Sequence, residues 1–259
     1  MLPQIIKNNI DEQMDKERYY LVVKSNSMVR TSKYNLSTQE QKVILYIISK
    51  IKPDDTEFNE QVFNLKDLCN IFGIEYNSKN YINFRNAIQN LSDKSFWIEK
   101  DNKEILVRWL EYVSIDKDNM TVSVKLNHYL EPYLLGAYVN TTQYLLHNIL
   151  AMRSKYSIRL YELMKSYAYL KKVEIELSTL KKLLSLENNK YPVYKDFRVR
   201  VLEPAIDEIN KYTEIKIQIT PIRTKQAITS ILFTIKNKTK AEFQKARLEI
   251  DKQLFMYEN

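Results

Sequence analysis

Two segments of this 259-residue chain carry the same pattern, and this internal repeat is the strongest constraint on the fold. A pair of leucines recurs 112 residues later and a Phe-Arg dipeptide recurs 113 residues later: Leu65 and Leu68 with Leu177 and Leu180, and residues 84–85 with 197–198. In both halves three helical segments precede strand-like segments. Because a pattern repeated in the same order is most simply explained by two copies of one module, the sequence predicts two small, related domains.

The first copy begins with a helix. Ser37 followed by Glu40 has the spacing of a capping box, which satisfies two free amides at a helix start. Apolar residues then recur at helical intervals as far as Ile51. Two more helices and three alternating, strand-like runs follow in order: helices at 63–74 and 78–94, and strands at 95–100, 104–115 and 120–127.

The second copy follows after residue 136, near which Pro132 and Gly136 interrupt the pattern. Its predicted elements have the same order: a helical region at 141–171 in two pieces, helices at 177–186 and 191–212, and a hairpin at 214–236 whose tip lies near 223–226. A trailing polar helix is predicted over residues 241–259.

Three helices and a hairpin are typical of the winged helix-turn-helix. We therefore predict an α+β protein with two tandem winged helix-turn-helix domains related by an internal pseudo-repeat. The predicted domains are residues 1–136 and residues 137–259. In this architecture the second helix of the turn enters a major groove of DNA, with its first residues nearest the base edges.

Scarce residue types exclude several classes of protein. The chain has only two glycines, so neither a P-loop nor the glycine-rich loop of a dinucleotide-binding fold is possible. The single cysteine, Cys69, excludes an internal disulfide and a cysteine-based zinc site within one chain. The first residues lack the pattern of a signal peptide, and no apolar run approaches the roughly 20 residues needed to span a bilayer. We expect a cytoplasmic protein that has no membrane partner and needs no metal or cofactor.

The positive charge of the chain is confined to its second half. Residues 1–136 hold 18 Lys and Arg against 19 Asp and Glu, whereas residues 137–259 hold 22 against 13. The whole excess of +8 therefore comes from the second predicted domain. A basic domain indicates a polyanionic partner, with nucleic acid the first candidate, although a merely soluble basic surface is an alternative.

Three cations stand near the start of the predicted helix at 191–212, where the helix dipole disfavours positive charge. They are Lys195, Arg198 and Arg200. Arginine and lysine pair with guanine O6 and N7 in the major groove, which accounts for this placement. The alternative is that they are solvated cations beside Asp196 and Glu203. A 100° helical projection gathers the apolar side of this helix from Tyr194, Val201, Ala205, Ile209 and Tyr212. Arg200 lies opposite this side and Arg198 lies nearer its edge.

Other candidate DNA contacts are predicted at the second hairpin and on the first domain. Arg223 and Lys225 at the hairpin tip suit a wing that contacts phosphates or the minor groove, and an exposed turn is the alternative. In the first domain five polar residues share the face of helix 78–94 opposite its apolar side: Lys79, Arg85, Asn86, Gln89 and Asn90. Asn and Gln suit the N6 and N7 atoms of adenine, although solvated amides are usual on an exposed helix face.

Several sequence blocks resemble the initiator replication proteins of iteron-containing, theta-replicating bacterial plasmids. The blocks are "MVRTSKYNLSTQEQKVILYIIS", "SIRLYEL", "LSTLKKLLSL", "DFRVRVLEPAIDEIN" and "ILFTIK", and the resemblance covers Leu21 to Lys238. It implies two winged-helix domains, the second for the main iteron contacts and the first for auxiliary DNA contacts and dimerisation. By the same resemblance Lys195, Arg198 and Arg200 fall on the basic recognition-helix motif, where the family often has an arginine in place of Val199.

The resemblance also implies a function and partners. Such proteins bind direct repeats at a plasmid origin, promote melting of an adjacent A·T-rich segment and repress their own promoter as dimers. The expected partners are double-stranded origin DNA, a second copy of the chain, the host replication initiator and the replicative helicase.

Two alternatives to this function remain. A winged-helix transcriptional regulator would use the same contacts without an origin role. A nicking initiator enzyme would need clustered histidines to hold a metal, but His128 and His147 stand 19 residues apart in different predicted domains. We therefore expect a DNA-binding protein that is not an enzyme.

Overall fold

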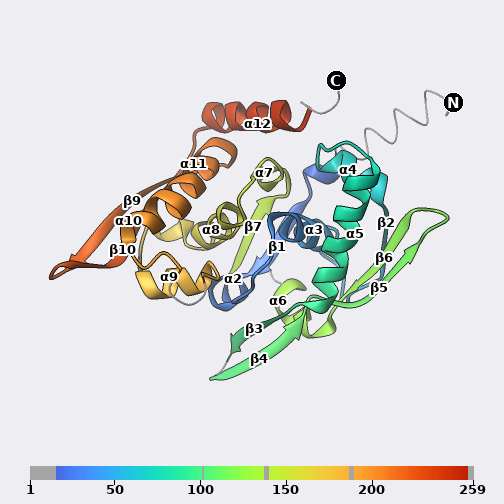
Figure 1. The fold of residues 1–259 in the computed structure, drawn as a ribbon, viewed down its shortest axis with the longest axis horizontal. Coiled ribbons are helices and arrows are strands. Elements are labelled where there is room, and N and C mark those ends of the chain that lie inside the picture. Colours follow the sequence, from blue (N-terminus) through green and yellow to red (C-terminus); the bar gives the residue numbers. More distant parts are fainter. Residues whose placement is uncertain (1–15, 101, 137–139, 187–189, 256–259) are drawn as a thin grey trace.

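The computed structural model describes residues 16–100, 102–136, 140–186 and 190–255 of the chain. Two winged-helix units lie next to each other, with the hairpin of residues 215–237 in the second unit at one end of the molecule and the hairpin of residues 110–126 in the first at the other (Figure 1). The predicted α+β fold with two tandem winged-helix units is confirmed.

The first unit is built on a capped helix. Ser37 Oγ accepts from the Glu40 amide at 3.2 Å and Glu40 Oε2 accepts from the Ser37 amide at 2.9 Å, so the predicted capping box is present. The elements of this unit, in chain order, are α3 (Thr38–Ser49), β2 (Gln61–Asn64), α4 (Leu65–Ile71), α5 (Ser78–Asp93), β5 (Leu110–Asp116) and β6 (Thr121–Leu126). The strands form an antiparallel sheet in the order β2-β6-β5.

The second unit has the same topology. Its elements are α8 (Lys155–Ser166), β8 (Lys172–Glu176), α9 (Leu177–Leu183), α10 (Tyr194–Phe197), the π-helical turn η3 (Arg198–Leu202), α11 (Glu203–Tyr212), β9 (Ile215–Thr224) and β10 (Ala227–Asn237). The antiparallel sheet order β8-β10-β9 matches β2-β6-β5 strand for strand. The turn between β9 and β10 falls at residues 225–226, at the predicted tip.

The residues that revealed the repeat occupy equivalent places. Leu65 and Leu177 begin α4 and α9, each directly after the first strand of its sheet. In the next helix of each unit, Phe84 and Phe197 are both completely buried, and the arginine that follows each of them is exposed. The pseudo-repeat therefore reflects a shared pattern of burial.

One predicted helical segment is wrong. Residues 141–145, placed in a helix from sequence, form the strand β7 (Thr141–Leu145), which pairs antiparallel with β1 (Leu21–Ser25). Its side chains alternate, with Thr142 and Tyr144 buried and Gln143 exposed, as a half-buried strand requires. Its partner lies more than a hundred residues away in the chain, so local periodicity did not reveal it.

The first unit also has a hairpin that the second lacks. Strands β3 (Ser95–Lys100) and β4 (Lys103–Arg108) form a separate two-stranded sheet and lie between α5 and β5 in the chain, and Trp97 of β3 also forms an isolated bridge with Lys33. The predicted strand over 104–115 is thus two strands, divided at the buried Trp109.

Short helices and a last long helix complete the molecule. The short ones are α2 (Asn26–Thr31), η1 (His128–Leu130), α6 (Glu131–Leu134), α7 (His147–Leu150) and η2 (Ala168–Leu170). The predicted trailing helix is α12 (Lys240–Phe255), and it packs on the rest of the molecule through three buried residues, Ala246, Ile250 and Leu254. No helix in the described part of the chain is long and apolar enough to cross a membrane.

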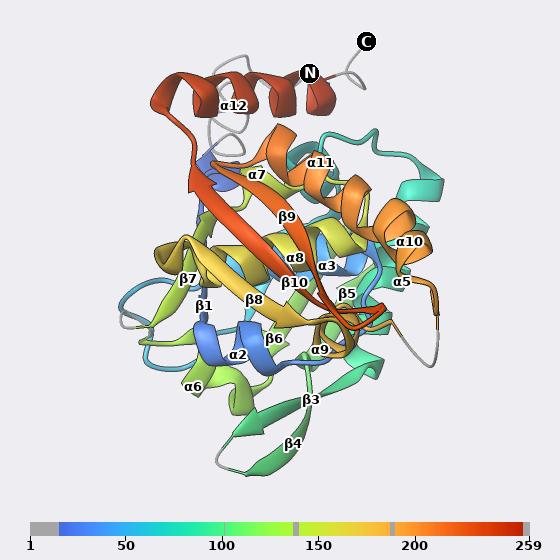
Figure 2. The same cartoon turned by 90° about the vertical axis from the view of Figure 1, so that its left-hand side faces the viewer.

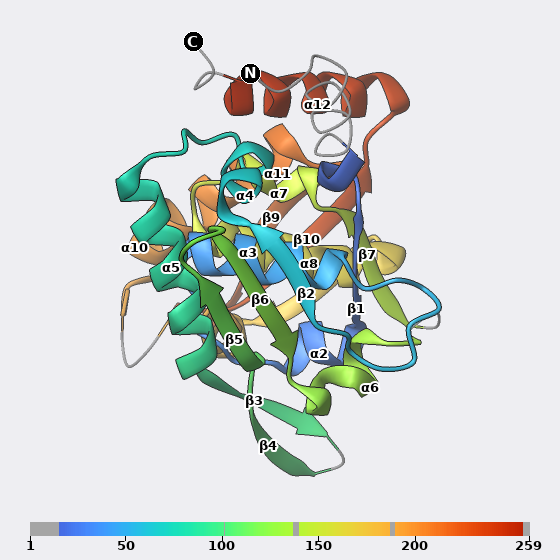
Figure 3. The same cartoon turned by 90° about the vertical axis from the view of Figure 1, so that its right-hand side faces the viewer.

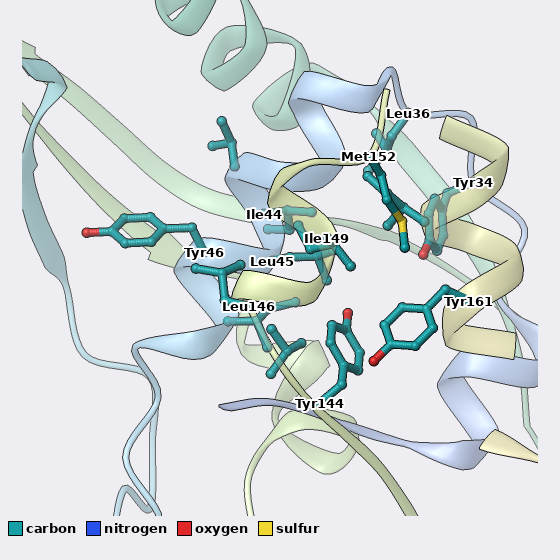
Figure 4. Packing of buried hydrophobic residues seen from close by; sticks show 14 of the residues in the cluster. Tyr34, Leu36, Ile44, Leu45, Tyr46, Tyr144, Leu146, Ile149, Met152 and Tyr161 are labelled. Atoms are coloured by element: carbon teal, nitrogen blue, oxygen red, sulfur yellow. The ribbon is translucent and has the colours of Figure 1, made fainter. Parts of the chain in front are cut away.

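The hydrophobic core is continuous between the two units. Figure 4 shows Ile44 and Leu45 of α3 packed close to Leu146 and Ile149, with Tyr161 of α8 beside them. The strand pair β1–β7 also joins residues on the two sides of the predicted boundary at 136. The boundary itself stays a prediction.

A buried polar network accompanies this contact. Lys24 Nζ of β1 lies 2.7 Å from Glu162 Oε1 of α8, and both side chains are at most 1% exposed. The hydroxyls of Tyr144 and Tyr34 donate to the same carboxylate at 2.7 and 3.0 Å. Burial alone raises the pKa of Glu162, but the charges of Lys24 and Arg159 outweigh it, so the pKa lies below the usual value. The carboxylate therefore remains charged in the interior.

Candidate nucleic-acid interface

The helix that begins at Tyr194 presents all three predicted cations to solvent. Lys195 lies in α10, and Arg198 and Arg200 lie in the π-helical turn η3. Each is exposed. The opposite side of the helix is held by fully buried apolar residues, including Phe197, Val201 and Leu202. The charged end of this helix is thus available for a ligand and rigidly supported from behind.

The π-helical turn changes which residues share a face. The amide of Glu203 donates to the carbonyl of Arg198, five residues earlier, so this turn contains one residue more than an α-helical turn. The projection at 100° per residue placed Val201, Ala205 and Ile209 on the apolar side, and they are buried. It omitted Phe197 and Leu202, which are buried as well. Isolated turns of this type occur frequently at functional sites.

The three cations differ in their surroundings. Arg198 Nε lies 2.9 Å from Glu203 Oε1 in a half-exposed ion pair. Among the described residues, Lys195 and Arg200 have no ion-pair partner. Because the carboxylate of Glu203 neutralises Arg198, the net positive charge of this helix comes mainly from Lys195 and Arg200.

The second hairpin also bears its cations at the tip. Arg223 lies near the end of β9 and Lys225 occupies the turn, where its φ of 58° is left-handed. Both side chains are exposed. A hydrogen bond of 2.9 Å between the hydroxyls of Thr224 and Thr229 connects the two strands beside the turn. The hairpin thus presents two cations at the end of a braced wing.

In the first unit, α5 carries the predicted polar face. Five residues are exposed on it: Lys79, Arg85, Asn86, Gln89 and Asn90. Asn90 also has a structural role, because its amide donates to Glu40 Oε1 at 2.9 Å. The helix is fixed from the other side by Phe84, Ile88 and Leu91, all completely buried.

Helices α5 and α10 face the same side of the molecule. Both lie along the right-hand edge in Figure 2 and along the left-hand edge in the opposite view of Figure 3. The two helices therefore border one side of the molecule. A duplex lying across this face meets both helices, whereas separate faces would need two DNA molecules or a sharp bend.

Two family profiles match this chain. A profile described as "Initiator Replication protein, WH1" matches residues 21–165, and one described as "Initiator Rep protein, WH2" matches residues 176–235. The chain belongs to the initiator replication protein family. The predicted resemblance is thereby confirmed.

Solved structures of other proteins match this chain to different extents. A crystal structure of the Pi initiator protein in complex with iteron DNA matches with a TM-score of 0.69 and 21% identity, over 86% of this chain and 99% of that chain. The WH1 domain of MSBI1.176, a replication protein isolated from a multiple sclerosis patient, matches with a TM-score of 0.30 and 22% identity, over 38% and 80% of the two chains. Domains 2 and 3 of RctB match with a TM-score of 0.48 and 11% identity, over 81% and 85%.

Neither histidine of this initiator family member lies in a cluster of metal ligands. His147 is buried, with Nε2 2.8 Å from Asp251 Oδ1, and burial lowers its pKa. His128 is exposed, with Nδ1 3.5 Å from Glu111 Oε2. Within the described ranges no three His, Cys, Asp or Glu residues are grouped so that they could hold a metal ion. Cys69 is buried, which raises the pKa of its thiol to about 11.

The structure also brings together cations that sequence reasoning missed. Lys94, directly after α5, and Lys155, the first residue of α8, line the same cleft between the two units. They stand 61 positions apart, and neither belongs to a basic run. No pattern of neighbouring residues therefore connected these two lysines. The candidate DNA contacts that were named from the sequence stay predictions.

Proposed function

We propose that this protein initiates plasmid replication by binding direct repeats in double-stranded origin DNA. The observation that supports this most is the placement of two recognition helices, α5 and α10 with its continuation α11, on one face of a single chain. Two helices in successive major-groove segments cover a longer site than one winged helix can. The fold of the Pi initiator, whose crystal structure contains iteron DNA, supports the same proposal.

The two units contribute differently in this proposal. The excess positive charge lies in residues 137–259, and the wing cations Arg223 and Lys225 extend it beyond the recognition helix. The second unit supplies most of the affinity through phosphates and guanines. The first adds register through α5 and contacts between two copies of the chain.

Origin melting is proposed to follow from binding energy alone. The sequence has no P-loop, so we propose a protein without enzymatic activity that deforms an adjacent A·T-rich segment, where flexible steps make bending and unstacking less costly. The host replication initiator and the replicative helicase would then act on the opened strand. Binding to a repeat at its own promoter would let a dimer repress its synthesis.

The test uses the DNA that flanks the coding region. Footprinting should protect tandem repeats of about 20 base pairs, as two adjacent grooves at roughly 10 base pairs per turn require. Permanganate should detect unpaired thymines in a neighbouring A·T-rich tract of a supercoiled plasmid once protein is added. Protection of a single promoter site without repeats and without permanganate reactivity would instead identify a transcriptional regulator.

A further inference from the structure

An exposed valine stands in the helix formed by α10, η3 and α11, the helix of the second unit that is proposed to enter a major groove. Val199 is 48% exposed, and its neighbours Arg198 and Arg200 are exposed as well. Phe197 and Val201, two residues before it and two residues after it, are at most 1% exposed. Because residues two positions apart in a helix do not face each other, Val199 lies on the side of the helix away from the core.

The π-helical turn exposes this valine. In a regular α-helix Val199 would share a side with Leu202 and Ile206, three and seven residues later, and both of these are buried. The turn holds one extra residue, because the amide of Glu203 donates to the carbonyl of Arg198, five positions earlier. One extra residue rotates the start of the helix by about 100° relative to α11. Val199, inside this turn, is thereby turned away from Leu202 and Ile206.

The equivalent helix of the first unit packs in the same way without the extra residue. After the buried Phe84 of α5, buried positions come three, four and seven residues later: Ala87, Ile88 and Leu91. After the buried Phe197 they come four, five and eight residues later: Val201, Leu202 and Ala205. Each position is displaced by one residue, and α5 is α-helical throughout. The second unit therefore presents three exposed residues, 198–200, where the first presents two.

Pro204 disfavours a regular α-helix at this place. It is the second residue of α11, inside a helix that continues without a break from Tyr194 to Tyr212. Proline has no amide hydrogen, and in an α-helix its ring clashes with the carbonyl four residues earlier, which here belongs to Arg200. Helix α5 contains no proline and has no such conflict. The exposed position of Val199 is thus built into the helix.

We propose that Val199 contacts the C5-methyl group of a thymine in the repeat. The proposal rests on the proposed function, because it takes this helix as the one that enters the major groove. The thymine methyl is the apolar group that base edges present in that groove, and an apolar side chain suits it. The arginines on either side suit guanine or phosphate instead. Val199 therefore adds the selection of a thymine to the contacts of the cations.

The decisive experiment removes the base methyl and the side chain, separately and together. Each thymine of a repeat duplex is replaced in turn by deoxyuridine, which lacks the C5-methyl group and keeps the base pair. With the wild-type protein one position should lose about fourfold in affinity, as expected for one buried methyl group. With Val199→Ala, affinity for the natural duplex should fall by a similar factor, and that same deoxyuridine should cause little further loss. Equal deoxyuridine profiles for the two proteins would overturn the proposal.

Val62→Ala is the matched control, because Val62 is a valine of β2 that is 61% exposed. It should leave both the affinity and the deoxyuridine profile unchanged. Thermal unfolding of Val199→Ala should occur at the wild-type temperature or above it, since the valine is half exposed and alanine favours a helix. This measurement distinguishes a lost contact from a lost fold.

Val199→Arg tests the same contact by a change of preference. Arginine pairs with guanine O6 and N7, so the preferred base at the sensitive position should shift from thymine towards guanine. Competition between duplexes that carry each of the four base pairs at this position measures the shift. A thymine preference retained in Val199→Arg would contradict a contact made by the valine.

The kind of DNA site separates this proposal from the proposed function. If footprinting finds one promoter site without repeats, the deoxyuridine scan is made on that site. A sensitive thymine there whose effect is lost in Val199→Ala shows that the initiator function fails and the thymine contact stands. If tandem repeats are bound and the neighbouring tract opens, but the two profiles are equal, the thymine contact fails alone.

Discussion

At the scale of single residues, the recognition helix combines cations in two electrostatic states. Arg198 shares its charge with Glu203 across an ion pair of 2.9 Å, and the adjacent Arg200 is exposed without such a partner in the described part of the chain. Burial raises the pKa of Tyr194 at the start of the same helix, so its hydroxyl stays neutral and leaves the positive charge there undiminished. The residues proposed to contact bases are thus distinguished by their neighbours as well as by their positions.

Arg200→Ala should weaken binding to the repeat duplex by about 1–3 kcal/mol, the value of a bidentate contact to guanine. Fluorescence anisotropy with repeat and scrambled duplexes measures the change, and the loss should be confined to the repeat. Arg85→Ala on α5 should cost less, because the first unit is proposed to add register more than affinity. Equal affinities of wild type and Arg200→Ala for the repeat would remove this arginine from base recognition.

Glu203→Gln should strengthen DNA binding several-fold, because it removes a carboxylate that repels phosphates and competes for Arg198. The free energy of unfolding should change by less than about 1 kcal/mol, as expected for an exposed ion pair. Anisotropy at two salt concentrations and urea unfolding measure the two effects. Unchanged affinity would show that Arg198 stays paired with Glu203 in the complex.

At the scale of elements, the last helix connects the two units. Gly73, just after α4, has a φ of +62°, and a Cβ built on it would lie 2.7 Å from the backbone of Leu254 in α12. Arg247 of α12 stacks on Tyr19, and Asp251 bonds His147. Helix α12 therefore packs both on the turn after α4 in the first unit and on His147 in α7. Position 73 requires glycine because its φ is left-handed and because a Cβ would clash with α12.

Gly73→Ala should lower the free energy of unfolding by more than Gly136→Ala does. Both glycines have a left-handed φ, which costs an alanine about 1 kcal/mol, but a Cβ on Gly136 meets nothing within 4 Å. The difference between the two variants isolates the contact with α12. Urea unfolding monitored by circular dichroism measures it, and equal losses would show that α12 moves aside without cost.

At the scale of the whole molecule, a buried ion pair holds the two halves of the chain together. Lys24 and Glu162 are 138 residues apart in sequence, and Glu162 receives two tyrosine hydroxyls besides. Removing one member of such a pair leaves the other charge buried and uncompensated, which costs far more than losing a surface pair.

Glu162→Gln should lower the free energy of unfolding at neutral pH by about 3 kcal/mol, whereas Glu249→Gln, at an exposed pair with Lys252, should cost less than about 1 kcal/mol. Urea unfolding measures both.

The same variant predicts a pH dependence. Because the pKa of Glu162 is lowered in the folded protein, its contribution is complete above the usual glutamate value of 4.5 and is lost as the pH falls through the lower, folded value. Wild type and Glu162→Gln should therefore converge in stability in acid. A constant difference across this range would contradict the charged state of Glu162.

The elements that bear the candidate site could be predicted from the sequence, but the contacts between these elements could not. The capping box at Ser37, the hairpin tip at Lys225 and the exposed face of α5 follow from residues within one or two turns of each other. The π-helical turn was not predicted, because a helical projection at a constant 100° per residue assumes the same number of residues in every turn. The strand β7 was missed because its pairing with β1 is not local.

The amino-acid sequence by itself determined that this protein has two copies of one winged-helix module, which helices carry the cations proposed to contact DNA, and that the second copy carries the net positive charge. These properties depend on short-range periodicity and composition. Only the tertiary structure decided that both recognition helices face one side, that Lys24 neutralises Glu162, and that Lys94 and Lys155 share one cleft. The physical reason is that these arrangements join residues far apart in the chain, and packing alone selects which of them meet.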